Sequence, residues 1–117
     1  MVLDTDLDGR RDAFNPAELL LAAVAACMIK GIERVTPILD FRLDGVQVWL
    51  HALRRDSPPC LRSIDYVIRG DTDESDHRLE LLHRNVRKYG TVFNTVAPGT
   101  RLQGTVERAG SVGNDPR

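Results

Sequence analysis

Cysteine and net charge are both scarce in this sequence. The chain has two cysteines, Cys27 and Cys60, and its first residues are acidic, without a basic segment ahead of an apolar stretch. A disulfide framework and a secretory signal peptide are therefore not expected, whereas reduced thiols in the cytoplasm are. The formal net charge is -1, from 16 basic and 17 acidic residues. That balance provides no field that would favour nucleic acid or an anionic membrane.

Long apolar runs are also missing. The longest unbroken one, residues 19–29, falls short of the roughly 20 residues that a bilayer-spanning helix needs. The 117 residues are 42% hydrophobic and 28% charged, which is typical of a single globular domain. We expect that domain to span residues 1–108. Residues 109–117 carry Gly, Ser, Asn and Pro, and are expected to be a disordered tail.

The clearest predicted element is a helix that begins after Asn15. Asn15 can cap it, Pro16 occupies the favoured first position, and Glu18 completes a capping box. The helix is expected to end near Val35, before Pro37, and its body is apolar on every face. Such a helix must be buried on all sides, so it is expected at the centre of the molecule.

Alternating apolar residues predict two strands, over residues 43–53 and 61–69, joined by a loop at 54–59. A second helix is expected over residues 75–89, with Gly90 as its C-terminal cap, and a last strand over 100–108. Three strands cannot easily cover a helix that is apolar all round. The pattern therefore favours a homodimer in which a second copy supplies the missing cover.

Two segments resemble the OsmC/Ohr superfamily. The first, Asn15 to Cys27, reads Asn-Pro-Ala-Glu-Leu-Leu-Leu-Ala-Ala-Val-Ala-Ala-Cys and is similar to the family's Asn-Pro-x-Glu-Leu-x-x-Ala-Ala-x-x-Ala-Cys. The second, Lys88 to Val96, resembles the end of the family's second long helix, where a Cys-Pro-Val sequence lies. With the elements between them, the resemblance covers residues 14–108.

The resemblance implies an α+β fold, with a central apolar helix and a second long helix packed on an antiparallel sheet in an intertwined homodimer. The strands that the family has before its first long helix have no counterpart in the sequence, so we expect them to be missing. Characterised members reduce hydroperoxides: one cysteine becomes a sulfenic acid, and a second cysteine resolves it as a disulfide. Carried over, this makes Cys27 the reactive cysteine, and the chemistry needs no cofactor.

The sequence departs from the family pattern in three ways. Gly90 stands where the second cysteine is usual, so Cys27 would depend on an external thiol reductant. Ala17 stands ten residues before Cys27, where Ohr-type members carry a carboxylate, and Glu18 follows it as in many broader OsmC-like proteins. No arginine matches the family's catalytic arginine, which lies on its N-terminal hairpin.

Residue chemistry leaves alternatives open for each candidate. The apolar neighbours of Cys27 favour a buried structural cysteine, whereas the family match favours a reactive one. Glu18 is nine residues away, about 180° around and about 13.5 Å along the helix, so capping is favoured over a catalytic role. Cys60 is a candidate resolving cysteine if the fold brings it near Cys27, and otherwise an ordinary strand-end residue.

Metal and nucleotide chemistry are not expected. His51, His77 and His83 lack the spacing of metal ligands, and no glycine-rich phosphate loop or catalytic serine arrangement is present. The sequence thus predicts a cytoplasmic hydroperoxide reductase that uses Cys27, a small hydroperoxide and an external thiol. The alternative is an inactive dimer of the same fold that binds a small apolar molecule or serves as an interaction module.

Overall fold

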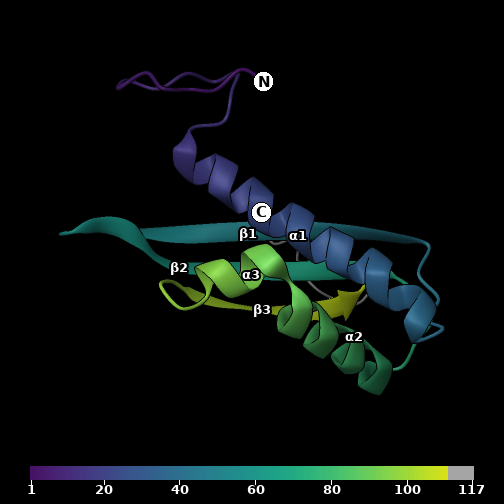
Figure 1. Cartoon of the computed structure of the whole chain (residues 1–117). Coiled ribbons are helices and arrows are strands. Elements are labelled where there is room, and N and C mark those ends of the chain that lie inside the picture. The colour runs from purple at the N-terminus through teal and green to yellow at the C-terminus, as the bar shows by residue number, and fades with distance from the viewer. Residues whose placement is uncertain (111–117) are drawn as a thin grey trace.

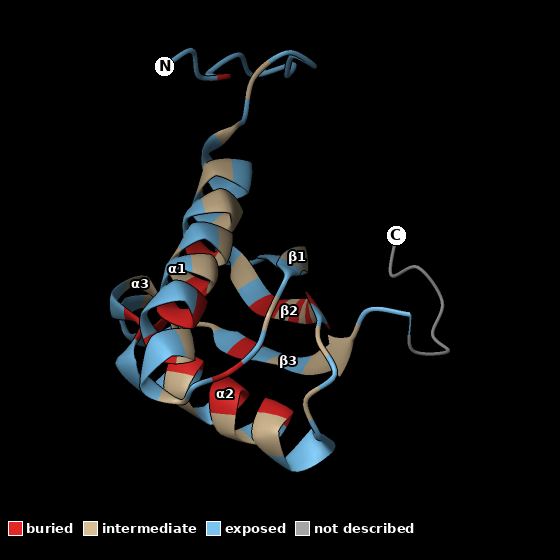
Figure 2. Cartoon of the chain, turned by 90° about the vertical axis from the view of Figure 1, so that its right-hand side faces the viewer, coloured by how far each residue is buried: buried red, intermediate tan, exposed pale blue. Residues whose placement is uncertain are grey.

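The computed structural model describes residues 1–110, which form three helices on one face of a three-stranded sheet (Figures 1 and 2). In chain order the elements are α1 (Pro16–Ile38), β1 (Gly45–Asp56), β2 (Pro59–Asp71), α2 (Asp76–Tyr89), α3 (Thr91–Val96) and β3 (Arg101–Arg108). The α+β prediction is confirmed. Residues 111–117, most of the expected tail, lie outside the described part of the chain.

Helix α1 begins with the predicted capping box. The Asn15 side chain accepts from the backbone N–H of Glu18 at 2.9 Å, and the Glu18 carboxylate accepts from the N–H of Asn15 at 3.0 Å. The predicted end near Val35 is wrong, because the helix continues through Pro37 to Ile38. Proline cannot donate to the carbonyl one turn back, but the Thr36 hydroxyl donates to that same carbonyl, of Glu33, at 3.3 Å.

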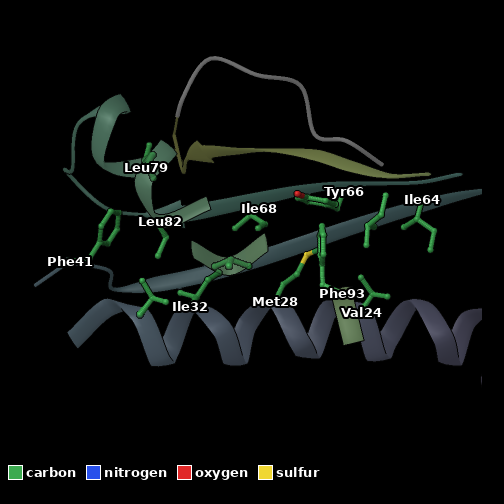
Figure 3. Close-up of a cluster of buried hydrophobic side chains, with 13 residues drawn as sticks. Val24, Met28, Ile32, Phe41, Ile64, Tyr66, Ile68, Leu79, Leu82 and Phe93 are labelled. Carbon is green, nitrogen blue, oxygen red and sulfur yellow. The ribbon is translucent and has the colours of Figure 1, made fainter. Parts of the chain in front are cut away.

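The expectation that α1 is buried on all sides does not hold within one chain. One stripe, made by Val24, Met28, Ile32 and Val35, is at most 3% exposed and packs toward the sheet (Figure 3). The other side remains open, and Ala23 and Ala26 are exposed there. The three-stranded sheet is too small to surround a helix, so it covers only the face that carries this apolar stripe.

The sheet has the order β1-β2-β3 and mixed direction. β1 and β2 form an antiparallel hairpin, as expected, but β3 runs parallel to β2, with Ser63 beside Arg101 and Gly70 beside Arg108. The wholly antiparallel expectation is therefore wrong for β3. Helices α2 and α3 bring the chain back to the end of the sheet where β2 begins, as a parallel pairing requires.

Both hairpin strands are longer than predicted. The expected loop at residues 54–59 is mostly strand, since the ladder continues through Arg55 and Cys60 to Asp56 and Pro59. β3 pairs only with residues 63–70 of β2, so the hairpin tip extends beyond the third strand (Figure 1). Polar and charged residues can form strands there because the tip is open to solvent.

The sequence did not indicate α3. Four of its six residues are β-branched and its N-cap, Gly90, has no side chain to cap it. Tertiary contacts hold it instead: Phe93 is buried in the core, and the Asn94 side chain donates to the Lys88 carbonyl at 3.0 Å. Packing thus overrides a weak local preference for helix.

The core lies between α1, α2 and the inner face of β2 (Figure 3). Ile64, Tyr66 and Ile68 project from β2, and Leu79, Leu82 and Val86 from the predicted apolar stripe of α2. Tyr66 packs over Gly104 of β3, where any side chain would overlap the tyrosine.

Candidate functional site

Cys27 lies in α1 at the edge of the core, opposite the junction of α2 and α3. Its side chain is half-buried and packs against the core cluster, and the thiol is not in a disulfide. It faces a cavity of about 590 Å³ between α1 and that junction, lined by Ala23, Ala26, Cys27, Lys30, Gly31, Arg34, Tyr89, Gly90, Thr91 and Val92. The half-buried thiol is therefore accessible to a small molecule.

The fold brings Gly90, which stands where the second cysteine is usual, next to Cys27. A Cβ placed on Gly90 would lie 3.2 Å from the Cys27 sulfur. Gly90 ends α2 in an extended conformation, with φ -78° and ψ 118°, and the chain turns there into α3. The two sequence segments that carry the family resemblance thus meet at the mouth of one cavity.

Two cations share the cavity wall with the thiol. Lys30 and Arg34 follow Cys27 by three and seven residues on α1, spacings that keep all three on one side of the helix. Arg34 Nη1 donates to the Tyr89 carbonyl at 3.2 Å, and its guanidinium lies 5.5 Å from the Tyr89 ring centre. The family pattern puts its arginine before the helix, so Arg34 was not anticipated, although its spacing from Cys27 could have indicated it.

Neither of the other sequence candidates reaches Cys27 within one chain. The Glu18 carboxylate caps α1, and Glu18 borders a different hollow, formed with the N-terminal segment. Cys60 is exposed at the hairpin tip, paired with Arg55 across the ladder, and is not part of the cavity wall. Of Cys27, Glu18 and Cys60, Cys27 alone lies in the wall of the cavity between α1 and the α2–α3 junction.

A buried polar pair, not anticipated from sequence, lies between β2 and α2. The Tyr66 hydroxyl and His83 Nε2 are 2.6 Å apart, and the two residues are 2% and 7% exposed. Burial, and secondarily the Arg87 charge, lowers the pKa of His83, while burial raises the pKa of Tyr66. His83 follows Leu79 by four residues, so the two lie on the same buried face of α2. This spacing is the feature of the sequence that could have indicated that His83 is buried. The hollow beside it, about 360 Å³, is separate from the Cys27 cavity.

Residues 1–110 contain neither a cluster of metal ligands nor a membrane-spanning helix. Nowhere in this range do three His, Cys, Asp or Glu side chains gather as metal ligands would. Within the same range no helix combines the length and apolarity needed to cross a membrane.

Comparison with known proteins agrees with this geometry. A family model described as OsmC-like protein matches residues 8–103. An OsmC-like protein from Mycoplasma pneumoniae shares the fold with a TM-score of 0.79 and 18% identity, over 84% of this chain and 74% of that one. The organic hydroperoxide resistance protein OsmC from Legionella pneumophila gives 0.70 and 18%, over 90% and 79%.

The organic hydroperoxide resistance protein OhrB of Bacillus subtilis gives a TM-score of 0.67 at 14% identity, over 82% of this chain and 72% of that one. No curated protein matches the chain in sequence. The family model spans most of the chain, and it includes both Cys27 and Gly90. The sequence resemblance is thereby confirmed, and the chain belongs to the OsmC-like family.

Proposed function

We propose that this protein is a thiol-dependent hydroperoxide reductase that works with one cysteine, Cys27. The observation that carries the proposal is the position of the Cys27 thiol, half-buried against a cavity whose wall includes Lys30 and Arg34. Peroxide reduction needs a cysteine sulfur that a small oxidant can reach, and Cys27 is part of the wall of this cavity. Structural relatives named as organic hydroperoxide resistance proteins make an organic hydroperoxide the expected oxidant.

The chemistry would proceed in two stages. The Cys27 sulfur bonds to the distal peroxide oxygen, the O–O bond breaks, and the departing alkoxide takes a proton to become an alcohol. Cys27 is then a sulfenic acid. One external thiol displaces its hydroxyl as water, forming a mixed disulfide, and a second thiol releases Cys27 and leaves as the oxidised disulfide.

An external reductant fits the arrangement of the two cysteines. Gly90 occupies the place from which a side chain would reach the Cys27 sulfur, and Cys60 lies on the exposed hairpin tip. The cavity admits a small thiol directly to Cys27. We place the protein in the cytoplasm, where both cysteines and the reductant would be kept reduced.

We also propose a homodimer as the working form. The open side of α1, where Ala23 and Ala26 of the cavity wall lie, is a surface that one chain leaves uncovered. A second copy packed there would bury it and complete the cavity. Sedimentation velocity should give a dimer at micromolar concentration, whereas a monomer under those conditions would remove this part of the proposal.

The second candidate function is an inactive dimer that binds a small apolar molecule. It is favoured by the lining of the cavity, where Ala23, Ala26 and Val92 contribute only apolar side chains. The two functions differ in one measurable property, the oxidation of Cys27 by hydroperoxide.

That oxidation can be tested by intact-mass analysis after a stoichiometric dose of cumene hydroperoxide, with dimedone present to trap a sulfenic acid. We expect a dimedone adduct on Cys27 in the unaltered chain and in Cys60→Ser, and none in Cys27→Ser. If folded protein gains no adduct at Cys27, the reductase proposal is wrong and the apolar-ligand function takes its place.

A further inference from the structure

Tyr66 connects the sheet to the two helices that meet beside Cys27. Its hydroxyl lies 2.6 Å from His83 Nε2 in α2, and its ring meets the Phe93 ring of α3 edge-on, with centres 6.3 Å apart (Figure 3). Tyr66, His83 and Phe93 are 2%, 7% and 5% exposed. These contacts are interior to one chain, so they do not depend on what a second copy covers.

The same contacts fix the position of Gly90, which lies against the thiol. Gly90 joins α2 to α3, and a Cβ there would lie 3.0 Å from the Phe93 Cβ and 3.2 Å from the Cys27 sulfur. The Gly90 carbonyl also accepts from the Asn94 N–H at 2.8 Å, which ties Gly90 to α3. A shift of α3 away from Tyr66 would therefore move Gly90 and uncover one side of the sulfur.

His83 also borders a hollow of about 360 Å³. The charged residues of its wall all come from α2, whereas α3 contributes the uncharged Phe93; they are Glu80, Arg84, Arg87 and Lys88. Of these, the Glu80 carboxylate favours a charged imidazole, and the Arg87 charge opposes one. From β2, the titratable group against the ring is the Tyr66 hydroxyl.

Protonation of His83 would break its hydrogen bond with Tyr66. A neutral imidazole can accept from the Tyr66 hydroxyl at Nε2, whereas an imidazolium carries an N–H on both nitrogens and can only donate. Burial disfavours the charged ring, so a protonated His83 gains free energy by turning into the hollow, where water and Glu80 can stabilise it.

We propose that the hydrogen bond between Tyr66 and His83 is a proton-sensitive clamp that holds the α2–α3 junction against the Cys27 thiol. When His83 is protonated, the clamp opens, the junction loosens and the sulfur becomes more exposed. Tyr66 and His83 are positioning residues, because they act on the thiol through Phe93 and Gly90. This deepens the reductase proposal and rests on it for the role of Cys27 as the reactive thiol.

The exposed Cys60 is an internal standard for the reactivity of Cys27. A short pulse of N-ethylmaleimide labels both, and peptide mapping gives the ratio of label on Cys27 to label on Cys60, at pH values where circular dichroism shows a folded chain. Both reactions need a thiolate, so the ratio removes most of the pH dependence of the reagent.

The parent chain should show a ratio that depends on pH. Burial lowers the pKa of His83, so the clamp opens only below the ordinary histidine value of about 6.5. We expect a constant ratio from about pH 8 to about pH 6.5, and a rise of about two- to tenfold by about pH 5, the effect of losing one hydrogen bond.

Two substitutions separate the clamp from ordinary stability. His83→Gln keeps an acceptor for the Tyr66 hydroxyl but cannot be protonated, so its ratio should stay constant with pH. Tyr66→Phe keeps the ring and loses the hydroxyl, so its ratio should be raised about two- to tenfold already at about pH 7.5. The matched controls, which should reproduce the parent profile, are Ile68→Val, a buried change on the same strand, and His77→Gln, at an exposed histidine of α2.

A constant ratio in the folded parent chain would overturn the proposal. So would a rise that persists in His83→Gln, or a Tyr66→Phe variant that is labelled like the parent at neutral pH. If Ile68→Val reproduces the effect of Tyr66→Phe, a general loss of stability explains the labelling and the clamp is equally refuted.

Failure of the reductase proposal has a different signature. Maleimide labelling needs no peroxide, so in that case the ratio still depends on His83 while cumene hydroperoxide leaves Cys27 unoxidised. If both proposals hold, the parent should be oxidised faster than His83→Gln below about pH 6.5, and at an equal rate at neutral pH. Equal oxidation rates at every pH would overturn the link between the clamp and the reaction of Cys27.

Discussion

The Cys27 sulfur and the α-carbon of Gly90 are placed as two halves of a disulfide would be. A Cβ on Gly90 would lie 3.2 Å from the sulfur, and in a disulfide each Cβ lies about 3 Å from the opposite sulfur, given an S–S bond of about 2.05 Å. The site has one cysteine because residue 90 is glycine, and a cysteine side chain at that one position would give it two.

Gly90→Cys should therefore form a disulfide with Cys27 under mild oxidation. The new Cβ would also lie 3.0 Å from the Phe93 Cβ, so we expect a stability cost of about 1–3 kcal/mol in the reduced form. Thiol titration and peptide mapping by mass spectrometry measure the bond. Gly45→Cys, where an added Cβ meets nothing within 4 Å, is the control and should keep all its thiols free. If the introduced thiol stays free in the oxidised, folded Gly90→Cys variant, the assigned geometry is contradicted.

Glu18→Gln tests whether Glu18 caps the helix or takes part in the chemistry. Glutamine can still accept from the Asn15 N–H, so we expect an unchanged rate of Cys27 oxidation and little change in stability. Asn15→Ala removes the other half of the capping box and should lower the free energy of unfolding by about 1 kcal/mol. Stopped-flow oxidation and urea unfolding give the two readouts. A slow Glu18→Gln variant of normal stability would make Glu18 a catalytic candidate again.

Because His83 is buried, we expect the stability of the fold to fall at acidic pH. Burial lowers the pKa of His83 in the folded state, so the unfolded chain binds its proton at higher pH than the folded one does. Stability is therefore full above the ordinary histidine pKa of about 6.5 and falls as the pH drops below it. Urea unfolding at a series of pH values from about 8 down to about 5 measures the slope.

His83→Gln should flatten that slope, whatever it does to stability at neutral pH. His77→Gln is the matched control on the same helix, because His77 is exposed and should leave the slope in place. An unchanged slope in His83→Gln would mean that other groups cause the acid sensitivity.

Gly104→Ala should be strongly destabilising. The added methyl would overlap the backbone carbonyl and the ring of Tyr66. Tyr66 is 2% exposed and hydrogen-bonded to His83, so neither its carbonyl nor its ring can easily move. We expect a loss of about 3 kcal/mol, the upper end of overpacking in a core. Gly45→Ala adds the same methyl to an open position of β1 and should change stability by no more than about 0.5 kcal/mol. Equal urea midpoints for the two variants would contradict the packing described for Tyr66.

Patterns that are local in the chain predicted most of the fold. The capping box at Asn15, the apolar stripe of α2 and the alternation in β1 and β2 each depend on residues a few positions apart. The family motif located Cys27 in the same way, since it sets a cap and a cysteine in one helical register.

Contacts between distant segments decided the rest. The parallel direction of β3 depends on where α2 and α3 return the chain, and α3 itself exists because Phe93 is buried. The same holds for the site: Gly90 reaches Cys27, and Arg34 reaches Tyr89, across sequence separations that no periodicity encodes. The sequence by itself determined α1, α2 and the three strands, and it placed Cys27 in the family motif. Only the tertiary structure decided what surrounds that thiol, because a side chain's neighbours across a packed interface are chosen by how whole elements dock.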